Sequence, residues 1–169
     1  MTYKMSLATK HKTILSCDPG YDRLGIAVLV GSVHESSLLY SACAQTDKKE
    51  DLSTRLAQLH KELLSVIKKY KPDAIAVEKL FFSTNNKKSA LAVAESRGMV
   101  LTLAGIHNIK VIEHSPQEVK IAVTGYGNAS KKDVMDMTKR LIKGISPKAL
   151  DDEYDAVALA ICALASYKK

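Results

Sequence analysis

Three apolar segments separated only by short turns occupy residues 13–45, and this arrangement restricts the fold more than any other feature of the sequence. The segments span residues 13–18, 23–30 and 36–45, and the connections DPG and GSVHE contain the residues that favour turns. Three strands connected so closely are expected to form an antiparallel meander. The sequence therefore predicts that a sheet is built from the N-terminal end of the chain.

The rest of the chain alternates helices with two further strands. Leucines recur at helical spacing between residues 50 and 70, and the short apolar segment AIAVE at 74–78 predicts a buried strand. Residues 86–106 predict a helix rich in small side chains, and residues 109–114 predict another strand. We therefore expect an α/β fold, in which a mixed five-stranded sheet is flanked by helices on both faces.

Helix start signals mark the C-terminal third of the chain. Ser115 precedes a proline and is followed three residues later by a glutamate, which is typical of a capping box. The sequence SKKD at 130–133 is a second start of this kind, and the helix that follows it is expected to stop at Gly144. The last helix is expected to begin near Asp151 or Asp152.

The length of the chain favours one domain. With 169 residues, of which 46% are apolar, the chain can bury one hydrophobic core but hardly two. We expect a single domain over residues 13–169, preceded by a short basic tail at residues 1–12 that lacks the apolar core of a signal peptide. No apolar stretch approaches the roughly 20 residues that a membrane span requires, so we expect no membrane partner.

The charge balance favours a polyanionic partner. Lys and Arg number 25 against 18 Asp and Glu, which gives a formal net charge of +7. Nucleic acid is the leading candidate, because each neutralised phosphate releases counterions, and a charge that serves only solubility is the alternative. The 3 cysteines are scattered and form no CxxC, so neither a disulfide framework nor a zinc site is indicated. This cysteine usage predicts a reducing compartment, the cytoplasm.

Four acidic residues are placed to meet at one edge of the sheet. Asp18 ends the first predicted strand, Glu78 ends the fourth, and Asp152 and Asp155 lie on one face of the last helix. If the first and fourth strands are parallel neighbours, these carboxylates converge. Carboxylates crowded together repel one another, so such a cluster is stable mainly when divalent cations neutralise it. Oxygen ligands select Mg²⁺ or Mn²⁺ over zinc, and two such ions about 4 Å apart support phosphodiester hydrolysis.

Each of these acids also has a purely structural interpretation. Asp18 in an Asp-Pro-Gly sequence is a common turn former, Asp152 suits a helix N-cap, and Asp155 suits the first helical turn. Glu78 is harder to explain in this way, because Glu is depleted in strands and costly to bury without a partner. Neighbouring acids, namely Asp22, Asp151 and Glu153, leave the exact membership of the cluster open.

Taken in order, these motifs resemble the RuvC family of Holliday junction resolvases. The resemblance covers residues 13–166 and includes the DPG turn, the Glu before an aromatic residue, the SRG helix, QEVK, GYGNASKKDV and DDEYDAVALAI. It implies an RNase H-like fold, a homodimer, and symmetric nicking of four-way junction DNA with two Mg²⁺ ions per active site, for which Mn²⁺ would substitute. Whether a branch-migration motor also partners the protein is left open by the sequence.

The resemblance also implies roles for individual residues. It gives Asp18, Glu78, Asp152 and Asp155 as the catalytic metal ligands and selects Asp152 rather than Asp151. Lys120 and Lys131 match lysines near the scissile phosphate, and Lys132 replaces Lys131 if the alignment shifts by one. Further DNA backbone contacts are expected from Lys87, Lys88 and Arg97. Solvated lysines at helix starts are the ordinary alternative.

Two further expectations concern the segment after Glu78 and the helix that follows it. Phe81 matches a family aromatic that stacks on bases at the junction centre, whereas adjacent Phe82 is expected to be a core residue. The alternative, which burial statistics alone favour, is that both form a hydrophobic plug under the loop. The small-residue helix at 86–106 is expected to form the dimer interface, or else to pack tightly on the sheet.

Other functions remain open at this point. An RNase H-type nuclease acting on RNA–DNA hybrids would use the same acids, although the matches at Phe81 and the lysines argue against it. A non-catalytic protein that binds branched DNA would not need all the acids. An actin-like sugar kinase also begins with an acidic turn, but this chain is short for one and has no second glycine-rich phosphate loop.

Overall fold

A computed structural model describes residues 11–20, 22–32, 35–80 and 87–167, without the side chains of 87–89. Its centre is a five-stranded mixed sheet with the strand order β3-β2-β1-β4-β5. The first three strands pair antiparallel, and β4 and β5 run parallel to β1. Their bounds are β1 Lys12–Pro19, β2 Arg23–Gly31, β3 Ser36–Gln45, β4 Ala74–Glu78 and β5 Lys110–His114. The predicted meander and mixed sheet are confirmed.

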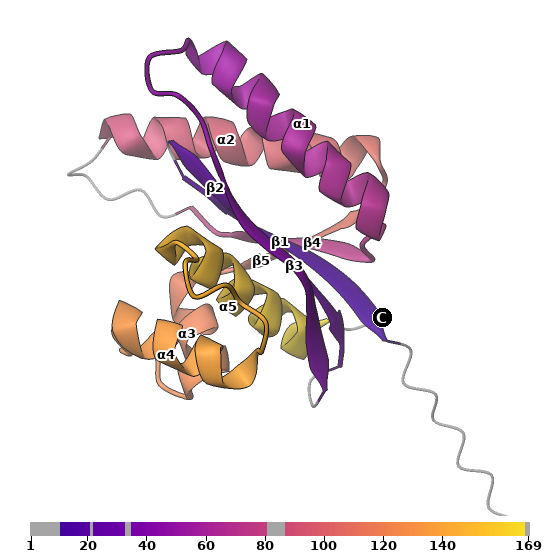
Figure 1. The fold of residues 1–169 in the computed structure, drawn as a ribbon, viewed down its shortest axis with the longest axis vertical. Helices are drawn as coiled ribbons and strands as arrows, with labels where there is room; N and C mark the ends of the chain where they lie inside the picture. Colours follow the sequence, from indigo (N-terminus) through magenta and orange to yellow (C-terminus); the bar gives the residue numbers. More distant parts are fainter. Residues whose placement is uncertain (1–10, 21, 33–34, 81–86, 168–169) are drawn as a thin grey trace, which may run out of the picture.

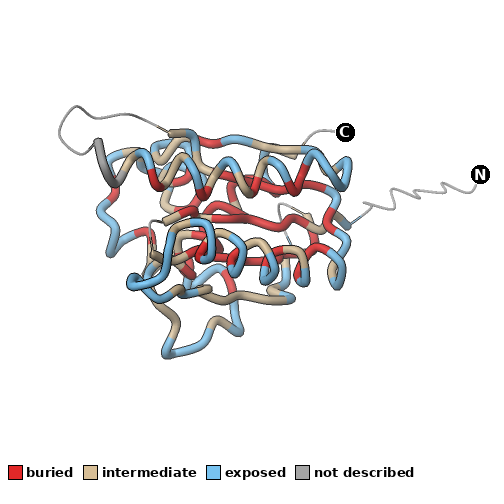
Figure 2. The backbone as a smooth tube through the Cα atoms, turned by 90° about the horizontal axis from the view of Figure 1, so that it is seen from above, coloured by how far each residue is buried: buried red, intermediate tan, exposed pale blue. Residues whose placement is uncertain are grey.

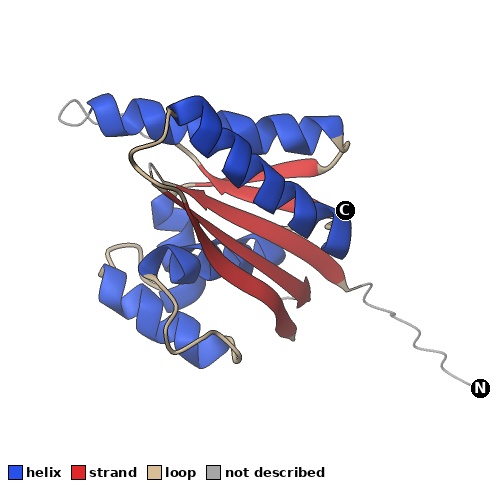
Figure 3. Cartoon of the chain, turned by 45° about the horizontal axis from the view of Figure 1, so that its top comes forward, coloured by secondary structure: helices blue, strands red, loops and turns tan. Residues whose placement is uncertain are grey.

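Helices cover both faces of this sheet. The first two lie on one face and the last three on the other, as Figure 1 and Figure 3 show from different directions. Their bounds are α1 Leu52–Tyr70, α2 Lys87–Ile106, α3 Pro116–Thr124, α4 Lys131–Leu141 and α5 Asp151–Ser166. No helix in the described ranges is both long and apolar enough to cross a membrane.

The alternation of side chains along each strand divides the core into two layers. In β1, Leu15 and Cys17 pack toward α1 and α2, whereas Ile14 packs in the cluster formed with α3, α4 and α5. Buried residues accordingly follow the strands through the middle of the molecule in Figure 2. Because the period is two, Ser16 and Asp18 share the α5 face with Ile14.

The starts of α3 and α4 agree with the predicted capping signals, but the end of α4 differs from the prediction. Ser115 and Ser130 both form the predicted capping boxes. The helix α4 ends at Leu141, however, before the Gly144 that was expected to stop it. Ile142 takes an extended conformation and is buried, with only 3% of its surface exposed, so the chain leaves the helix to fill the core. Gly144 instead adopts a positive φ in the turn that follows.

Candidate active site

The ends of β1 and β4 place two carboxylates side by side. These strands pair in parallel, with Cys17 opposite Val77, so Asp18 and Glu78 come next on each strand. Asp18 follows Ile14 and Ser16 on the α5 face, and Glu78 follows Ala76 on the same face. The predicted parallel pairing of the first and fourth strands is therefore confirmed.

The first turn of α5 lies directly against β2 beside these carboxylates. Gly25 pairs with Asp18 across the β1–β2 ladder, and a Cβ at Gly25 would lie 2.0 Å from the carbonyl oxygen of Asp152. One turn further along, the Ser16 hydroxyl donates to the carbonyl oxygen of Ala156 at 2.6 Å. The lack of a side chain at Gly25 and the buried hydrogen bond from Ser16 thus determine how closely α5 packs on the sheet.

A pocket of about 280 Å³ opens where these elements meet. It contains three of the four predicted acids and two of the predicted lysines; Lys132 is exposed and does not line it. Its lining residues are Asp18, Glu78, Pro116, Val119, Lys120, Lys131, Val134, Asp155 and Ala158. Between the two lysines that the sequence left as alternatives, the geometry therefore favours Lys131 at the pocket.

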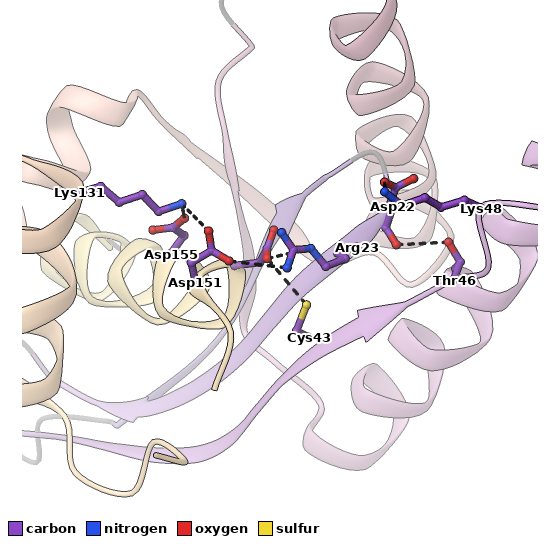
Figure 4. Close-up of polar contacts among 9 residues, drawn as sticks. Asp22, Arg23, Cys43, Thr46, Lys48, Lys131, Asp151 and Asp155 are labelled. Carbon is purple, nitrogen blue, oxygen red and sulfur yellow. Dashed lines mark hydrogen bonds and ion pairs between the residues drawn. The ribbon is translucent and has the colours of Figure 1, made fainter. Parts of the chain in front are cut away.

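Asp152 does not line this pocket, because its side chain is directed to β2 and β3. Its Oδ2 lies 3.2 Å from Nε of Arg23 and 3.9 Å from the Cys43 thiol, which is placed to donate to it. Arg23 also approaches Asp151, with a distance of 3.7 Å between Nη1 and Oδ1. Figure 4 shows Arg23 and Cys43 on this side of the acidic cluster. The expected convergence of four carboxylates is thus only partly present.

Burial and mutual repulsion make the acids in the pocket costly to ionise. Burial, followed by the charges of Asp155, Glu78 and Asp152, raises the pKa of Asp18 to about 7. Burial is also the main reason that the pKa values of Glu78 and Asp155 are raised. A positive charge placed among these groups would lower all three pKa values, so the electrostatics favour cation binding.

Lys131 supplies one such charge. Its Nζ lies 3.0 Å from a carboxylate oxygen of Asp155 and 3.0 Å from one of Asp151, as drawn in Figure 4. Although burial alone would lower the pKa of this lysine, the hydrogen bonds to both carboxylates outweigh burial and raise it. Lys131 is therefore a fixed cation at the edge of the acidic pocket.

The acids fit a divalent cation in chemical type. All of them offer hard oxygen ligands, which suit Mg²⁺ and Mn²⁺. Within the described ranges, however, no three His, Cys, Asp or Glu side chains are grouped closely enough to hold an ion as they stand. Closing on an ion would therefore require side-chain rotations, above all by Asp152, whose carboxylate now faces Arg23.

The other acids that the sequence left as alternatives have structural partners outside the pocket. Asp22 binds the Arg55 guanidinium of α1 at 2.8 Å. It also binds the Lys48 ammonium at 2.6 Å, and Figure 4 shows these two residues away from Lys131 and Asp155. Glu153 is buried and accepts a hydrogen bond from Ser41 at 2.5 Å. The N-cap of α5 is Leu150, so Asp152 lies inside the helix and is not its cap.

The other residues that were predicted to contact DNA do not line the pocket or lie outside the described part of the structure. Arg97 hydrogen-bonds to the carbonyl oxygen of Glu78 at 3.3 Å and forms an ion pair with Glu113, so it braces the strand ends. Lys87 and Lys88 begin α2, but their side chains lie outside the described part of the structure, as does Phe81. Their contacts with DNA stay predictions.

Sequence reasoning missed three residues that hold the site together, namely Arg23, Gly25 and Cys43. A signal for the first two was present: along β2, Leu24 and Ile26 belong to the α1–α2 core, so alternation assigns Arg23 and Gly25 to the acidic face. The same alternation marks Cys43, because it pairs with Gly25 across the β2–β3 ladder and its neighbour Ala44 packs against the α1–α2 core.

Comparison with known proteins agrees with this geometry. The sequence matches the family model described as "Crossover junction endodeoxyribonuclease RuvC" over residues 14–163. A relative of that description from Pseudothermotoga lettingae is 44% identical over 149 residues, which cover 88% of this chain and 91% of the relative. Another, from Thermotoga maritima, is 37% identical over 149 residues, which cover 88% of each chain.

A solved structure extends the similarity to three dimensions. The structure of T. thermophilus RuvC in complex with a Holliday junction substrate has a TM-score of 0.81 and is 28% identical in sequence. The match covers 89% of this chain and 92% of that one. Together with the family match, this confirms the expected fold. The chain therefore belongs to the RuvC family of crossover junction endodeoxyribonucleases.

Proposed function

We propose that this protein resolves four-way DNA junctions by paired, symmetric nicks, and that the acidic pocket is where each phosphodiester is cut. The observation that carries the proposal is the convergence of Asp18, Glu78 and Asp155 with Lys120 and Lys131 around one pocket at the sheet edge. Acids suited to metal ions and lysines suited to phosphate are the two groups that such a reaction needs. The relative bound to a Holliday junction supports the choice of substrate.

In this proposal the acids hold the metal ions. Asp18, Glu78, Asp155 and, after a side-chain rotation, Asp152 would supply the ligands. The chemistry that a pair of bound Mg²⁺ ions, or Mn²⁺ in their place, supplies to such a site is activation of water and stabilisation of the leaving oxygen. The fold brings the backbones of these ligands together, since two come from strand ends and two from the first two turns of α5, and the side chains then need only rotate to meet an ion.

The lysines act on the DNA. Lys120 and Lys131 come from α3 and α4 on the side of the pocket opposite the sheet, where they would hold the scissile phosphate against the acids. Lys131 is now paired with Asp155 and Asp151. A phosphate entering the pocket would compete for its ammonium group, which would leave Asp155 available as a ligand.

Paired nicks also require two sites related by a two-fold axis, and we propose that α2 forms the dimer interface. Its outer face exposes Leu91 and Ile106, with 62% and 65% of their surfaces accessible. On the same helix, a Cβ at Gly98 or Gly105 would meet nothing within 4 Å, so another backbone can approach closely there. Sedimentation should accordingly show a dimer.

The cytoplasm is the proposed location, and junction DNA is the proposed partner. All three cysteines are free thiols, as a reducing compartment requires. A branch-migration motor is a candidate additional partner. Phe81 is proposed as the side chain that stacks on bases at the junction centre.

The function is tested by incubating the protein with labelled four-way junction, linear duplex and RNA–DNA hybrid in Mg²⁺. We expect two nicks at symmetric positions in the junction and little cutting of the other substrates. Preferential cutting of the hybrid would favour the RNase H-type alternative. Junction binding without cutting would favour the non-catalytic one.

A further inference from the structure

A second cluster of positive charge lies at the far end of α4 from the active site. From Met137 to Leu150 the sequence contains no acidic residue. The same stretch contains four exposed cations. We call this cluster the α4 basic patch; it consists of Lys139, Arg140, Lys143 and Lys148.

Among the residues that the structure describes, no carboxylate neutralises the charges of the α4 basic patch. None of its members forms an ion pair with another residue in the described part of the chain. The Lys139 ammonium lies 5.0 Å from the centre of the Tyr154 ring, a contact that leaves its charge intact. By contrast, Lys131 at the other end of the same helix is paired with two carboxylates.

The patch borders a pocket of its own. This pocket has a volume of about 420 Å³ and is lined by Lys139, Lys143, Pro147 and Tyr154, among others. The loop beside it has a defined shape, because the Tyr154 hydroxyl donates to the carbonyl oxygen of Ser146 and the Lys148 amide donates to the Ser146 hydroxyl. The cations are therefore presented on an ordered surface with space for a phosphate group.

The distance between the patch and the active site matches the spacing of phosphates along duplex DNA. Lys131 and Lys139 are eight positions apart on one helix, which corresponds to about 12 Å along its axis at 1.5 Å per residue. Successive phosphates of one strand advance about 3.4 Å along a DNA duplex, so 12 Å corresponds to roughly four base pairs. A duplex arm that runs along α4 from a scissile phosphate at Lys131 can therefore place phosphates near the patch.

We propose that the α4 basic patch binds backbone phosphates of a duplex arm, roughly three to five base pairs from the cut. This inference rests on the proposed function, since it assumes that junction DNA occupies the acidic pocket. The patch would add affinity and orient the arm without reading sequence, because phosphate contacts position the protein and base contacts specify. Lys68 and Lys69 on α1, by contrast, lie over the opposite face of the sheet.

The test compares two variants with the same loss of charge. The first is the triple variant Lys139→Gln, Lys143→Gln and Lys148→Gln. Its control is the triple variant Lys61→Gln, Lys68→Gln and Lys69→Gln on α1, where all three lysines are exposed. Junction binding is measured by fluorescence anisotropy without divalent cations, over a range of salt concentrations.

We expect the patch variant to bind at least about tenfold more weakly at low salt, and the slope of log K against log salt to fall by about 2 to 3 per protomer. The control should change both quantities much less. Wild-type protein is also assayed for cleavage of the same junction in Mg²⁺; binding without cleavage there would contradict the proposed function but not this inference. An equal loss of junction affinity in the two variants, or no loss in the patch variant, would overturn the inference. An acidic protein would then be the better candidate for a partner of the patch.

A second measurement needs no variant and therefore does not depend on its folding. Methylphosphonate groups neutralise chosen phosphates of the junction, either three to five nucleotides from the cut or at the far end of the arm. Wild-type affinity should fall only for the first set. Wild-type binding that ignores the first set would contradict the inference.

Discussion

Gly25 and Asp152 are in direct backbone contact: a Cβ on Gly25 would lie 2.0 Å from the carbonyl oxygen of Asp152 and 2.7 Å from its carbonyl carbon. Because Gly25 also pairs with Asp18 across the sheet, this contact sets the distance between the strand that carries one acid and the helix that carries two others. The geometry of the acidic pocket thus depends on a residue that has no side chain.

Gly25→Ala should therefore displace the first turn of α5 and disable the site. Backbone atoms at 2.0 Å cannot be avoided by a rotamer change, so we expect a loss of about 1–3 kcal/mol in the free energy of unfolding. Cleavage should fall at least about tenfold, as a shift near 1 Å in a catalytic group can cost a hundredfold. Thermal denaturation and junction cleavage measure the two effects. A Gly25→Ala protein with the wild-type unfolding temperature would contradict the steric explanation.

Asp22→Asn should lower stability without removing activity. Asp22 binds the guanidinium of Arg55, which is only 5% exposed, and the Thr46 amide donates to the Asp22 carbonyl oxygen. Loss of the carboxylate charge weakens the charge-assisted hydrogen bond between Asp22 and this buried arginine, and we expect a cost of about 1–3 kcal/mol. Denaturation should show this loss while junction cleavage stays within about threefold of wild type. Loss of cleavage in a folded Asp22→Asn protein would show that the acidic cluster has been assigned wrongly.

Arg23 is expected to compete with a metal ion for Asp152. Its Nε lies 3.2 Å from Oδ2 of Asp152, and the carboxylate therefore faces β2 instead of the pocket. In Arg23→Gln this charge-assisted contact and its positive charge are lost, so Asp152 should rotate toward the pocket more easily and the Mg²⁺ concentration for half-maximal cleavage should fall. Mn²⁺ binding measured by calorimetry should tighten in parallel, and Arg23→Lys should stay closer to wild type in both measurements. An unchanged metal dependence in Arg23→Gln would exclude this role.

The stability of the metal-free protein should depend on pH through Asp18. Its pKa in the folded protein is raised to about 7, so the folded state binds this proton more tightly than the unfolded state does. The resulting stabilisation is complete below about pH 4 and is lost as the pH rises through about 7. In EDTA, wild type should therefore lose stability relative to Asp18→Asn between about pH 5 and pH 8. Thermal denaturation of both proteins over this range checks the prediction, and parallel curves would contradict it.

Much of the fold could be predicted because local signals and global structure agree. The turns between the first strands, the capping boxes at Ser115 and Ser130, and the strand ending in Glu78 all depend on short-range chemistry. Period-two alternation then brings Asp18 and Glu78 to one face without knowledge of the helices. That part of the candidate site follows from the sequence alone.

The rest depends on tertiary contacts that no local pattern contains. The end of α4 is set by the burial of Ile142, which outweighs the stop signal at Gly144. The direction of the Asp152 side chain is set by Arg23 and Cys43, which reach it from β2 and β3 only because α5 lies close to the sheet. The contacts of Asp152 join residues more than a hundred positions apart, and a local sequence pattern does not indicate which distant residues will meet.

The most direct test of the account is the single-turnover cleavage of a four-way junction by Asp18→Asn in Mg²⁺, with junction binding measured in parallel. If the acidic pocket is the nuclease site, cleavage should fall at least about a hundredfold while binding stays close to wild type, because affinity comes mainly from phosphate contacts. Glu78→Gln and Asp155→Asn should behave in the same way. An Asp18→Asn protein that cuts the junction near the wild-type rate would contradict the central claim.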